Sequence, residues 1–298
     1  MRLELSEEEG SLAADVPLAP RTTWKIGGPA RCLCRVRNEA GLAGALASAS
    51  ASGTPVALLG MGSNVLVADE GFPGLVLRLE GDFLKISIEG ERLTAGGGAA
   101  LGAVCAAAAR AGLSGIEPIS GIPSSLGAAV RINAGAYGGE IFDVLAEARL
   151  VSPSGAGRGV GADEIPHGYR WTELVETREI VVSAILALVR APAEQIEAKT
   201  RLVAEKRRGA LPSEPNAGSV FKNPPGDFAG RLIEACGLKG ARRGGAVIST
   251  RHANVIVNDG GARAADVLEL MKIARDAVRE RFGITLAPEV ELLGMRWD

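Results

Sequence analysis

The segment from Gly115 to Ile141, GIEPISGIPSSLGAAVRINAGAYGGEI, constrains the fold more than any other stretch of the chain. It is dense in glycine and contains two prolines, as loops are, yet most of its other residues are apolar. Disordered linkers are poor in such residues, because burial of apolar surface is what stabilises a folded chain. We therefore expect a folded loop that lies against a ligand.

Glycine is abundant in the whole chain, with 40 glycines among 298 residues. This is nearly twice the usual ~7% and follows no collagen period. Glycine permits sharp turns and close approach of the backbone to another group. Binding of phosphate by backbone N–H groups is one use of such positions.

Composition and charge describe an ordinary globular protein, with 47% hydrophobic and 23% charged residues. The length suffices for two domains, or for a large domain and a smaller one. The formal net charge of -2 provides no field that would attract nucleic acid or an anionic membrane. The N-terminus, MRLELSEEEG, is acidic, and no run reaches the ~18 apolar residues of a membrane span. A cytoplasmic protein is expected.

The four cysteines form neither a metal-ligand array nor a disulfide framework. We expect no metal, and we expect the thiols to be buried as small hydrophobic groups. The positions are Cys32, Cys34, Cys105 and Cys236.

In the first half of the chain, RTTWKIGGPARCLCRV (residues 21–36) predicts strand, turn and strand. An alanine-rich helix capped by Asn38 follows, and residues 53–60 read as a short buried strand. From that strand to about residue 79, the pattern is strand, glycine loop, strand, turn and strand. A hairpin about Glu89 and Gly90 precedes a helix that ends at Gly112.

In the second half, strand character resumes after the glycine-rich segment, and Pro192 marks a boundary. A charged helix, the proline-rich loop that carries Ser219, and a helix closed by Gly237 follow. A strand leads to a helix capped by Asp266, and APEVELLG is the last strand. One face of that helix is apolar: Val267, Leu270, Met271, Ala274, Val278 and Phe282.

Ser219 lies in AGSVFKNP, and its role needs explanation. A serine nucleophile requires a base, and the only histidines of the chain, His167 and His252, are distant in sequence. The flanking pattern also lacks the second glycine of the G-x-S-x-G elbow. A hydrolase is therefore disfavoured, although distant histidines could still meet in space. Another chemistry must use this hydroxyl beside Lys222 and Asn223.

The stretch GMGSNV, residues 60–65, begins like a dinucleotide-binding fingerprint but has Val65 where the third glycine belongs. A strand rather than a helix follows, so it is not a Rossmann turn. Its backbone N–H groups can still form an anion-binding nest, with Ser63 and Asn64 as further donors. By itself the pattern leaves phosphate binding and an ordinary tight turn open. Arg170 and Glu289 are likewise uninformative when each is taken alone.

Seven stretches, taken in order, closely resemble the UDP-N-acetylenolpyruvoylglucosamine reductase (MurB) family: TTWKIGGPA, GMGSNVLV, GIPSSLGAAVRINAGAYGGEI, YRWT, NAGSVFKNP, HANVIVN and APEVELLG. The match extends from about Thr22 to Gly294. The resemblance implies an α+β flavoprotein, with an FAD-binding fold of the vanillyl-alcohol oxidase (PCMH) type in two subdomains. The expected domains are residues 1–56 and 57–191 for FAD and residues 192–298 for the substrate.

The resemblance also implies the reaction. NADPH reduces noncovalently bound FAD, and flavin N5 then delivers hydride to the enolpyruvyl ether of UDP-N-acetylglucosamine, giving UDP-N-acetylmuramate for peptidoglycan. Ser219 would donate the proton to the resulting carbanion without help from a histidine. Arg170 and Glu289 would stabilise charge on the substrate carboxylate. Tyr169, Lys222 and Asn223 would hold the UDP-sugar, and we expect a monomer.

The flavin is expected to bind two glycine-rich regions, its pyrophosphate at the nest and its ring system at the later loops. The residues implied are Gly60, Met61, Gly62, Ser63, Asn64, Gly121, Ile122, Pro123, Ser125, Gly127, Asn133, Ala134, Gly135 and Gly138.

The chain departs from the family pattern at several positions. Ser124 and Ala128 stand where the family usually has glycine, and Thr172 replaces a serine. A lysine of some members is here Ala210, so another group must neutralise the UDP phosphates. The only tyrosines, Tyr137 and Tyr169, lie in other motifs, which indicates the shorter subclass without a lid tyrosine.

Two alternatives remain at this point. One is a flavin oxidase of the same fold that acts on a small alcohol, although many of these tether FAD through a histidine that the phosphate loop lacks. The other is a nucleotide-sugar binding protein with a degenerate flavin site. The presence of Arg170, Ser219 and Glu289 together disfavours the second.

Overall fold

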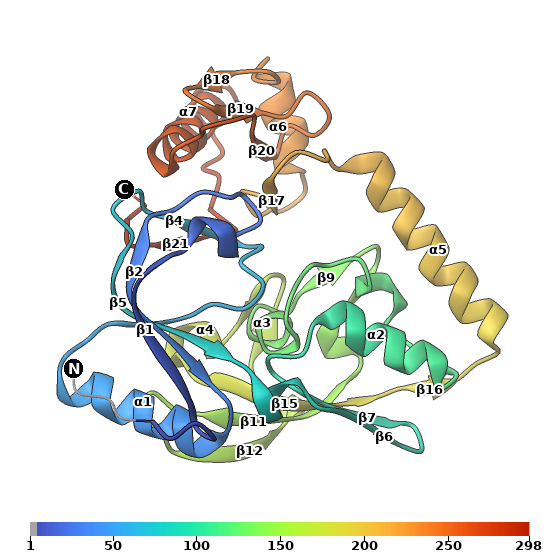
Figure 1. Cartoon of the computed structure of the whole chain (residues 1–298). Coiled ribbons are helices and arrows are strands. Elements are labelled where there is room, and N and C mark those ends of the chain that lie inside the picture. Colours follow the sequence, from blue (N-terminus) through green and yellow to red (C-terminus); the bar gives the residue numbers. More distant parts are fainter. Residues whose placement is uncertain (1–4, 298) are drawn as a thin grey trace. The chain divides into compact units, whose positions relative to one another are not determined.

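The computed structural model describes residues 5–297, and Figure 1 shows its helices and strands. The chain forms two compact units, each assembled from separate stretches of sequence. Within the described chain, unit one comprises residues 5–14, 32–61 and 74–206, and unit two comprises residues 15–31, 62–73 and 207–297. Residues 1–4, which open the acidic N-terminus, lie outside the described residues.

Unit one contains a five-stranded antiparallel sheet in the order β12-β11-β15-β7-β6. Its central strand, IVVSAILA, is rich in β-branched residues and buried along most of its length. The expected hairpin is confirmed, because Gly90 adopts φ +62° in the turn between the paired antiparallel strands β6 and β7. The strands are β6 (Ile86–Glu89), β7 (Arg92–Gly96), β11 (Leu145–Val151), β12 (Gly157–Gly161) and β15 (Ile180–Ala187).

Further helices and strands lie wholly or mostly within unit one. The helices are α1 (Glu39–Ala51), α2 (Leu101–Arg110), α3 (Leu126–Arg131), α4 (Leu174–Thr177) and α5 (Ala193–Ala210). Three two-stranded pairs are β8 (Leu113–Ser114) with β16 (Val189–Arg190), β9 (Gly135–Ala136) with β10 (Gly139–Glu140), and β13 (His167–Gly168) with β14 (Trp171–Thr172). A further sheet has the order β1-β2-β5-β3, with β1 (Gly10–Pro17), β2 (Pro29–Val36), β5 (Phe72–Leu79) and β3 (Val56–Leu58).

Helix α3 corrects the expectation that residues 115–141 form only a loop. Ser125 caps this helix, and Leu126, Ala129 and Val130 bury one of its faces. Gly127 lets the helix backbone approach β15, because a methyl group built there would lie 2.7 Å from the carbonyl oxygen of Val181. The high glycine content had suggested a loop, whereas this glycine serves close packing of a helix.

Unit two contains a four-stranded antiparallel sheet in the order β17-β20-β19-β18, which packs against α6 and α7 (Figure 1). Its elements are β17 (Asn216–Ser219), α6 (Ala229–Ala235), β18 (Arg242–Arg243), β19 (Ala246–Ile248), β20 (Val255–Asn258) and α7 (Ala264–Phe282). Strands β4 (Val65–Val67) and β21 (Glu291–Leu293) form a parallel pair. The predicted apolar face of α7 is confirmed, and Val267, Leu270 and Met271 are fully buried on it.

The segment around Trp24 belongs to unit two. Trp24 is fully buried, and its indole Nε1–H donates to the carbonyl oxygen of Ile256 over 2.7 Å. Asn258 Nδ2 donates to the carbonyl oxygen of Trp24 over 2.9 Å. The strand expected before Gly27 is therefore wrong, because these contacts hold residues 22–28 as an irregular segment.

Other local expectations are confirmed or corrected. Asn38 caps α1, since its Oδ1 accepts from the backbone N–H of Gly41. Helix α7 begins at Ala264, so Asp266 lies inside its first turn and its carboxylate accepts from the backbone N–H of Arg263. The strand expected to be short and buried, β3, has an exposed Val56.

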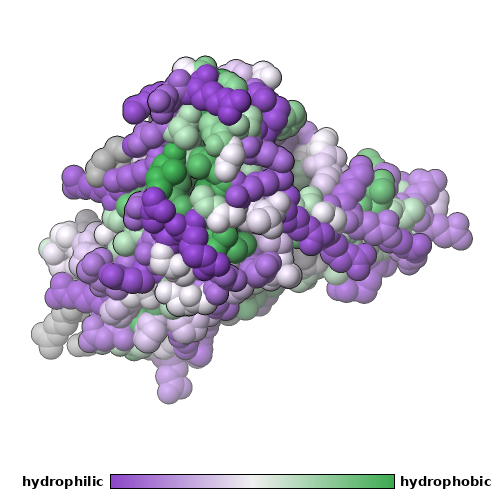
Figure 2. Space-filling model, turned by 90° about the horizontal axis from the view of Figure 1, so that it is seen from above, coloured by the Kyte–Doolittle hydropathy of each residue, from purple (hydrophilic) through white to green (hydrophobic). Residues whose placement is uncertain are grey.

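The cysteines divide into two kinds. Cys34 and Cys105 are buried as expected, and burial raises the pKa of each thiol to about 12. Cys32 and Cys236 are only partly buried, so the expectation is wrong for these two. Within residues 5–297 no helix is long and apolar enough to cross a membrane, and no cluster of three metal-ligating residues occurs. Hydrophilic residues cover most of the face seen in Figure 2.

Candidate functional site

The glycine loop after β3 contains two glycines with different physical requirements. A methyl group built on Gly60 would lie 2.7 Å from Ser125 Oγ, so the loop passes close to the start of α3. Gly62 adopts φ +66°, and a side chain there would also collide with the carbonyl oxygen of Arg21. Gly62 therefore demands glycine, and Gly60 allows the loop to approach Ser125 closely.

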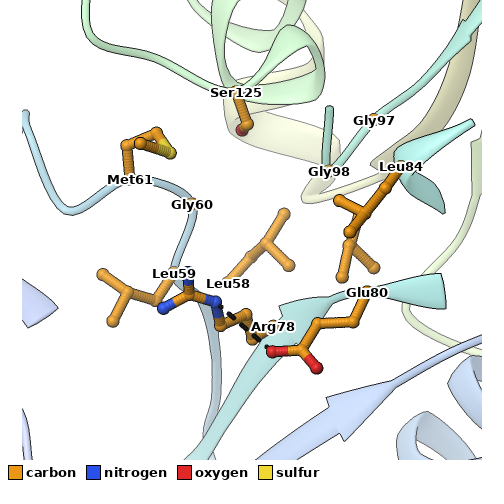
Figure 3. Close-up of a pocket in the computed structure, with 11 residues that line it drawn as sticks. Leu58, Leu59, Gly60, Met61, Arg78, Glu80, Leu84, Gly97, Gly98 and Ser125 are labelled. Atoms are coloured by element: carbon orange, nitrogen blue, oxygen red, sulfur yellow. Dashed lines mark ion pairs between the residues drawn. The ribbon is translucent and has the colours of Figure 1, made fainter. Parts of the chain in front are cut away.

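A pocket of about 130 Å³ opens in unit one beside this loop (Figure 3). Ser125 points into it from one side, and the ion pair of Arg78 with Glu80 lies on the opposite side. The lining residues are Leu58, Leu59, Gly60, Met61, Arg78, Leu79, Glu80, Leu84, Gly97, Gly98 and Ser125. The pocket thus brings together Gly60, Met61 and Ser125, three residues expected to bind the flavin.

Sequence reasoning missed Gly97, Gly98, Arg78 and Glu80. The run of three glycines from Gly96 to Gly98, directly after a predicted strand, was the available signal. Side chains are excluded there, because a methyl group on Gly97 would collide with the carbonyl oxygen of Val181. No sequence signal indicated the charged pair, since β5 was expected only as a strand.

The charges beside the pocket are unbalanced. Glu80 Oε1 lies 3.7 Å from Arg78 Nε and 3.5 Å from Arg35 Nε. Two guanidinium groups thus share one carboxylate, which leaves a net positive charge. A pocket walled by glycine backbone and bordered by this charge fits a phosphate-bearing cofactor.

The later glycine-rich loop follows α3. Asn133 and Ala134 are buried, and the backbone N–H of Ala134 donates to the carbonyl oxygen of Ala129. Tyr137 and Gly138 form the turn between β9 and β10, with φ +52° and +85°. The predicted residues Gly121 to Pro123 precede Ser124, whose carbonyl oxygen accepts from the backbone N–H of Leu101.

Arg170 lies in unit one, at the turn between β13 and β14. Its φ is +53°, and its guanidinium stands 5.5 Å from the centre of the exposed Tyr169 ring. Arg170 Nη2 donates to the carbonyl oxygen of Gly135 over 2.6 Å. Asn133 Nδ2 donates to the carbonyl oxygen of Gly168 over 3.1 Å. The arginine turn and the glycine-rich loop are therefore joined.

Ser219 and Glu289 come from neighbouring segments of unit two. The backbone N–H of Glu289 donates to the carbonyl oxygen of Val220, and that of Lys222 donates to the carbonyl oxygen of Ala287, each over 2.9 Å. Between them Phe221 pairs with Pro288. Two residues separated by 70 positions in the sequence thus lie on adjacent extended segments.

Asn64 joins the same region. Its Nδ2 donates to the carbonyl oxygen of Glu289 over 3.1 Å, and its own carbonyl oxygen accepts from the backbone N–H of Glu291 over 3.0 Å. Asn64 therefore supports the Glu289 segment, whereas Ser63, which precedes it, is only partly buried in the loop.

The loop after Ser219 is fixed by two asparagines. Asn223 Oδ1 accepts from the backbone N–H of Ala229 over 3.0 Å, at the start of α6. Asn254, 2% exposed, both accepts from the backbone N–H of Phe221 and donates to its carbonyl oxygen. Sequence reasoning missed Asn254, although a polar residue beside an apolar strand was a signal. Lys222 is partly buried between these two anchored positions.

Each histidine has a defined environment. His167, in unit one, stacks on Phe142 with ring centroids 4.0 Å apart. His252 Nδ1 accepts from the backbone N–H of Asn254 over 3.2 Å, and burial lowers the pKa of its imidazole. A neutral His252 with that nitrogen engaged is held as a structural group.

Two family models match the chain. Residues 30–158 match the FAD binding domain, and residues 211–293 match the UDP-N-acetylenolpyruvoylglucosamine reductase C-terminal domain. The expected flavin-binding fold is thereby confirmed. The fold and the site together define an FAD-containing oxidoreductase.

The relatives agree closely in length. UDP-N-acetylenolpyruvoylglucosamine reductase 2 of Symbiobacterium thermophilum is 44% identical over 96% of this chain and 94% of its own length. The reductase of Halalkalibacterium halodurans is 39% identical over 96% of each chain. The crystal structure of UDP-N-acetylenolpyruvylglucosamine reductase from Thermus caldophilus superposes with a TM-score of 0.82 at 40% identity, covering 95% of this chain and 98% of that one. The chain belongs to the UDP-N-acetylenolpyruvoylglucosamine reductase family.

Proposed function

We propose that this protein reduces the enolpyruvyl ether of UDP-N-acetylglucosamine to UDP-N-acetylmuramate with NADPH, in the synthesis of peptidoglycan precursors. Family membership supports the reaction. The observation that carries the assignment of residues is the pairing of the Ser219 segment with the Glu289 segment, which joins a hydroxyl to a carboxyl group in unit two.

FAD fits the pocket of unit one, because glycine backbone and a net positive charge meet there. Gly60, Met61, Gly97, Gly98 and Ser125 would hold it, with the rest of the nest to Asn64. When bound, FAD supplies the hydride, which it takes from NADPH, to the enolpyruvyl double bond.

Ser219 acts as the proton donor in this proposal. Addition of hydride to the alkene leaves a carbanion next to the substrate carboxylate, and this carbon is basic enough to accept a proton from a hydroxyl. No histidine is needed for that step. The engagement of His252 Nδ1 by Asn254 agrees with this view.

Arg170 and Glu289 act on the substrate carboxylate, where negative charge develops. The planar guanidinium of Arg170 offers two parallel donors, and Glu289 acts as a donor when protonated. Tyr169 and Lys222 are proposed to hold the UDP-sugar. Asn223 shapes the same loop through its bond to Ala229.

The setting of the reaction is part of the proposal. We infer a cytoplasmic monomer that binds a nucleotide sugar and neither nucleic acid nor membrane. The division into two FAD subdomains, residues 1–56 and 57–191, and a substrate domain, residues 192–298, stays a prediction.

Purified protein tests the assignment directly. It should be yellow, and acid precipitation should release all of the colour, because FAD is held without a covalent bond. Oxidation of NADPH should then depend on the enolpyruvyl UDP-sugar. Fast oxidation that ignores the sugar, or oxygen consumption with simple alcohols, would favour a flavin oxidase instead, and colourless protein would favour a binding protein.

A further inference from the structure

The turn that carries Arg170 is too small to be stable by itself. Strands β13 and β14 have two residues each, and their two backbone pairs are His167 with Thr172 and Gly168 with Trp171. A two-stranded hairpin is marginal in water even when it is longer. Arg170 also adopts φ +53°, in the left-handed region that residues with a side chain rarely occupy. Other contacts must hold this turn.

Three side-chain hydrogen bonds join the hairpin to residues 131–135. Thr172 Oγ1 donates to the carbonyl oxygen of Arg131 over 2.5 Å. Asn133 Nδ2 donates to the carbonyl oxygen of Gly168 over 3.1 Å. Arg170 Nη2 donates to the carbonyl oxygen of Gly135 over 2.6 Å. The bonds engage alternate positions of one segment, so the hairpin is fixed at three points along it.

Burial strengthens two of these bonds. Asn133 and Thr172 are both fully buried, and a buried donor that loses its partner is costly. The acceptor of Thr172 is the carbonyl oxygen of the last residue of α3, where helix carbonyls lack partners within the helix. Thr172 therefore ties the hairpin to the end of a packed helix.

Gly135 provides the space for the guanidinium. A methyl group built on Gly135 would lie 3.0 Å from Glu140 Cβ, 3.0 Å from the carbonyl oxygen of Gly139 and 3.3 Å from Arg170 Nη1, all tighter than such contacts normally come. The same residue accepts from Nη2 through its carbonyl oxygen. Gly135 thus accepts one hydrogen bond from the guanidinium, and a side chain at this position would crowd it.

We propose that Asn133, Gly135 and Thr172 form a clamp that aims Arg170, and that they are positioning residues for the reduction of the sugar. The proposal rests on the proposed function of Arg170. Asn133 and Gly135 were expected to bind the flavin; in this proposal they act through the arginine. A fixed guanidinium plane matters because a bidentate bond to a carboxylate requires one orientation.

The test compares Thr172→Val with Thr172→Ser, each alone and combined with Arg170→Lys. Rapid mixing measures two rates, flavin reduction by NADPH and flavin reoxidation by the enolpyruvyl sugar. Valine has the shape of threonine without the hydroxyl, so it should slow the sugar step about threefold to tenfold. Serine keeps the hydroxyl and should restore that rate. Flavin content and the NADPH step should stay within about twofold of wild type.

The double variant tests whether Thr172 affects the sugar step through Arg170. In the Arg170→Lys background, Thr172→Val should change the rate of the sugar step less than about twofold, because the guanidinium that Thr172 orients is absent. Thr177→Val is the matched control, since Thr177 donates to Glu179 elsewhere in unit one. Equal slowing of both steps by Thr172→Val, or a full further effect beside Arg170→Lys, would overturn the clamp.

A second variant covers the case in which Thr172→Val does not fold. Gly135→Ala adds a methyl group that crowds the turn at Gly139 and Glu140 as well as Arg170 Nη1. It should displace the guanidinium and slow the sugar step while flavin absorbance and the NADPH step are kept. Normal sugar turnover in Gly135→Ala would contradict the clamp. If Arg170→Lys alone leaves the sugar step unchanged, the proposed role of Arg170 fails first, and this result is distinguishable from failure of the clamp.

Discussion

The turn of Arg170 in unit one and the segment of Ser219 in unit two are held by different kinds of bond. Arg170 is fixed through side chains, its own and that of Asn133 among them. Ser219 is flanked by main-chain pairing, although the side chains of Asn64 and Asn254 also anchor the segments around it. It pairs with Val255 of β20, and the carbonyl oxygen of the next residue, Val220, accepts from the backbone N–H of Glu289.

The difference predicts how each region responds to mutation. Backbone bonds persist when side chains are exchanged, so the position of Ser219 should survive replacement of its own side chain. Side-chain bonds disappear with the residues that make them, so the orientation of Arg170 depends on particular neighbours. Replacement of Ser219 should therefore test its chemistry alone, whereas replacements near Arg170 test geometry.

The largest effect is expected for Ser219→Ala. The backbone at Ser219 should stay in place, so only the proton donor is lost. Reoxidation of the flavin by the enolpyruvyl sugar should slow by about 10²- to 10⁴-fold, the usual contribution of a general acid. Reduction by NADPH should proceed at nearly the wild-type rate, because that step needs no proton for the substrate. Stopped-flow absorbance of the flavin measures both.

Ser219→Cys is the control for this prediction, since a thiol also donates a proton. It should recover part of the rate that Ser219→Ala loses. The general-acid role is wrong if Ser219→Ala slows the NADPH step and spares the sugar step. Ser219 would then belong to a binding loop.

Arg170→Lys should have the next largest effect. Lysine keeps the charge but loses the planar fork and the bond to Gly135. Turnover of the sugar should fall more than about tenfold, in line with the loss of a preorganised donor. Flavin absorbance and the NADPH step provide the internal control. Unchanged turnover would remove Arg170 from the site.

The sequence predicted features that depend on neighbouring residues. The cap at Asn38, the hairpin at Gly90 and the apolar face of α7 are confirmed. Each follows from rules that act over a few positions. The family resemblance, which depends on the order of motifs, supplied the flavin fold.

Long-range contacts could not be predicted in the same way. Trp24 bonds to Ile256 across 232 positions, and Thr172 bonds to Arg131 across 41. Helix α3 was not predicted, because its glycine serves close packing rather than a turn. The pocket residues Arg78 and Glu80 were not predicted either, because Arg78 lies in an ordinary strand and Glu80 just after it. Local patterns indicate which residues turn or cap, but the partner of a distant side chain depends on the folded chain.

Glu117 provides a third and smaller test of how far unit one depends on hydrogen bonds made by side chains. The carboxylate is 3% exposed and accepts from Ser114 Oγ over 2.5 Å and from the backbone N–H of Gly115 over 2.6 Å. Lys199 Nζ lies 4.0 Å away. Burial, the largest influence, raises the pKa of Glu117, but these hydrogen bonds and the lysine charge outweigh it and lower the pKa overall.

Glu117→Gln should reduce the free energy of unfolding by about 1–3 kcal/mol near neutral pH. The NH₂ group of glutamine is a donor, and it would face the Ser114 hydroxyl or the Gly115 N–H, which now donate to the carboxylate. A carboxyl whose pKa is lowered by folding stabilises the fold at pH values above its ordinary pKa. This contribution is lost as the pH falls through the lowered pKa. The gap between Glu117→Gln and wild type should therefore narrow in acid. Urea unfolding at several pH values measures it, and a gap independent of pH would contradict the assignment.

Asp69→Ala should show the smallest effect. It should lower the free energy of unfolding and leave the rates of the two flavin half-reactions unchanged. Asp69 lies between β4 and β5, and its two carboxylate oxygens accept from the backbone N–H groups of Ala264 over 2.8 Å and Ala265 over 3.1 Å. It thereby caps the start of α7 from 195 positions away. Loss of a cap reduces the free energy of unfolding by about 0.5–2 kcal/mol.

Because backbone pairing holds the Ser219 and Glu289 segments, both flavin half-reactions of Asp69→Ala should keep their wild-type rates. Asp69→Asn retains one acceptor and should lie between wild type and Asp69→Ala in thermal unfolding. A slow sugar step in folded, flavin-loaded Asp69→Ala would show that unit two, like the Arg170 turn, depends on its side chains.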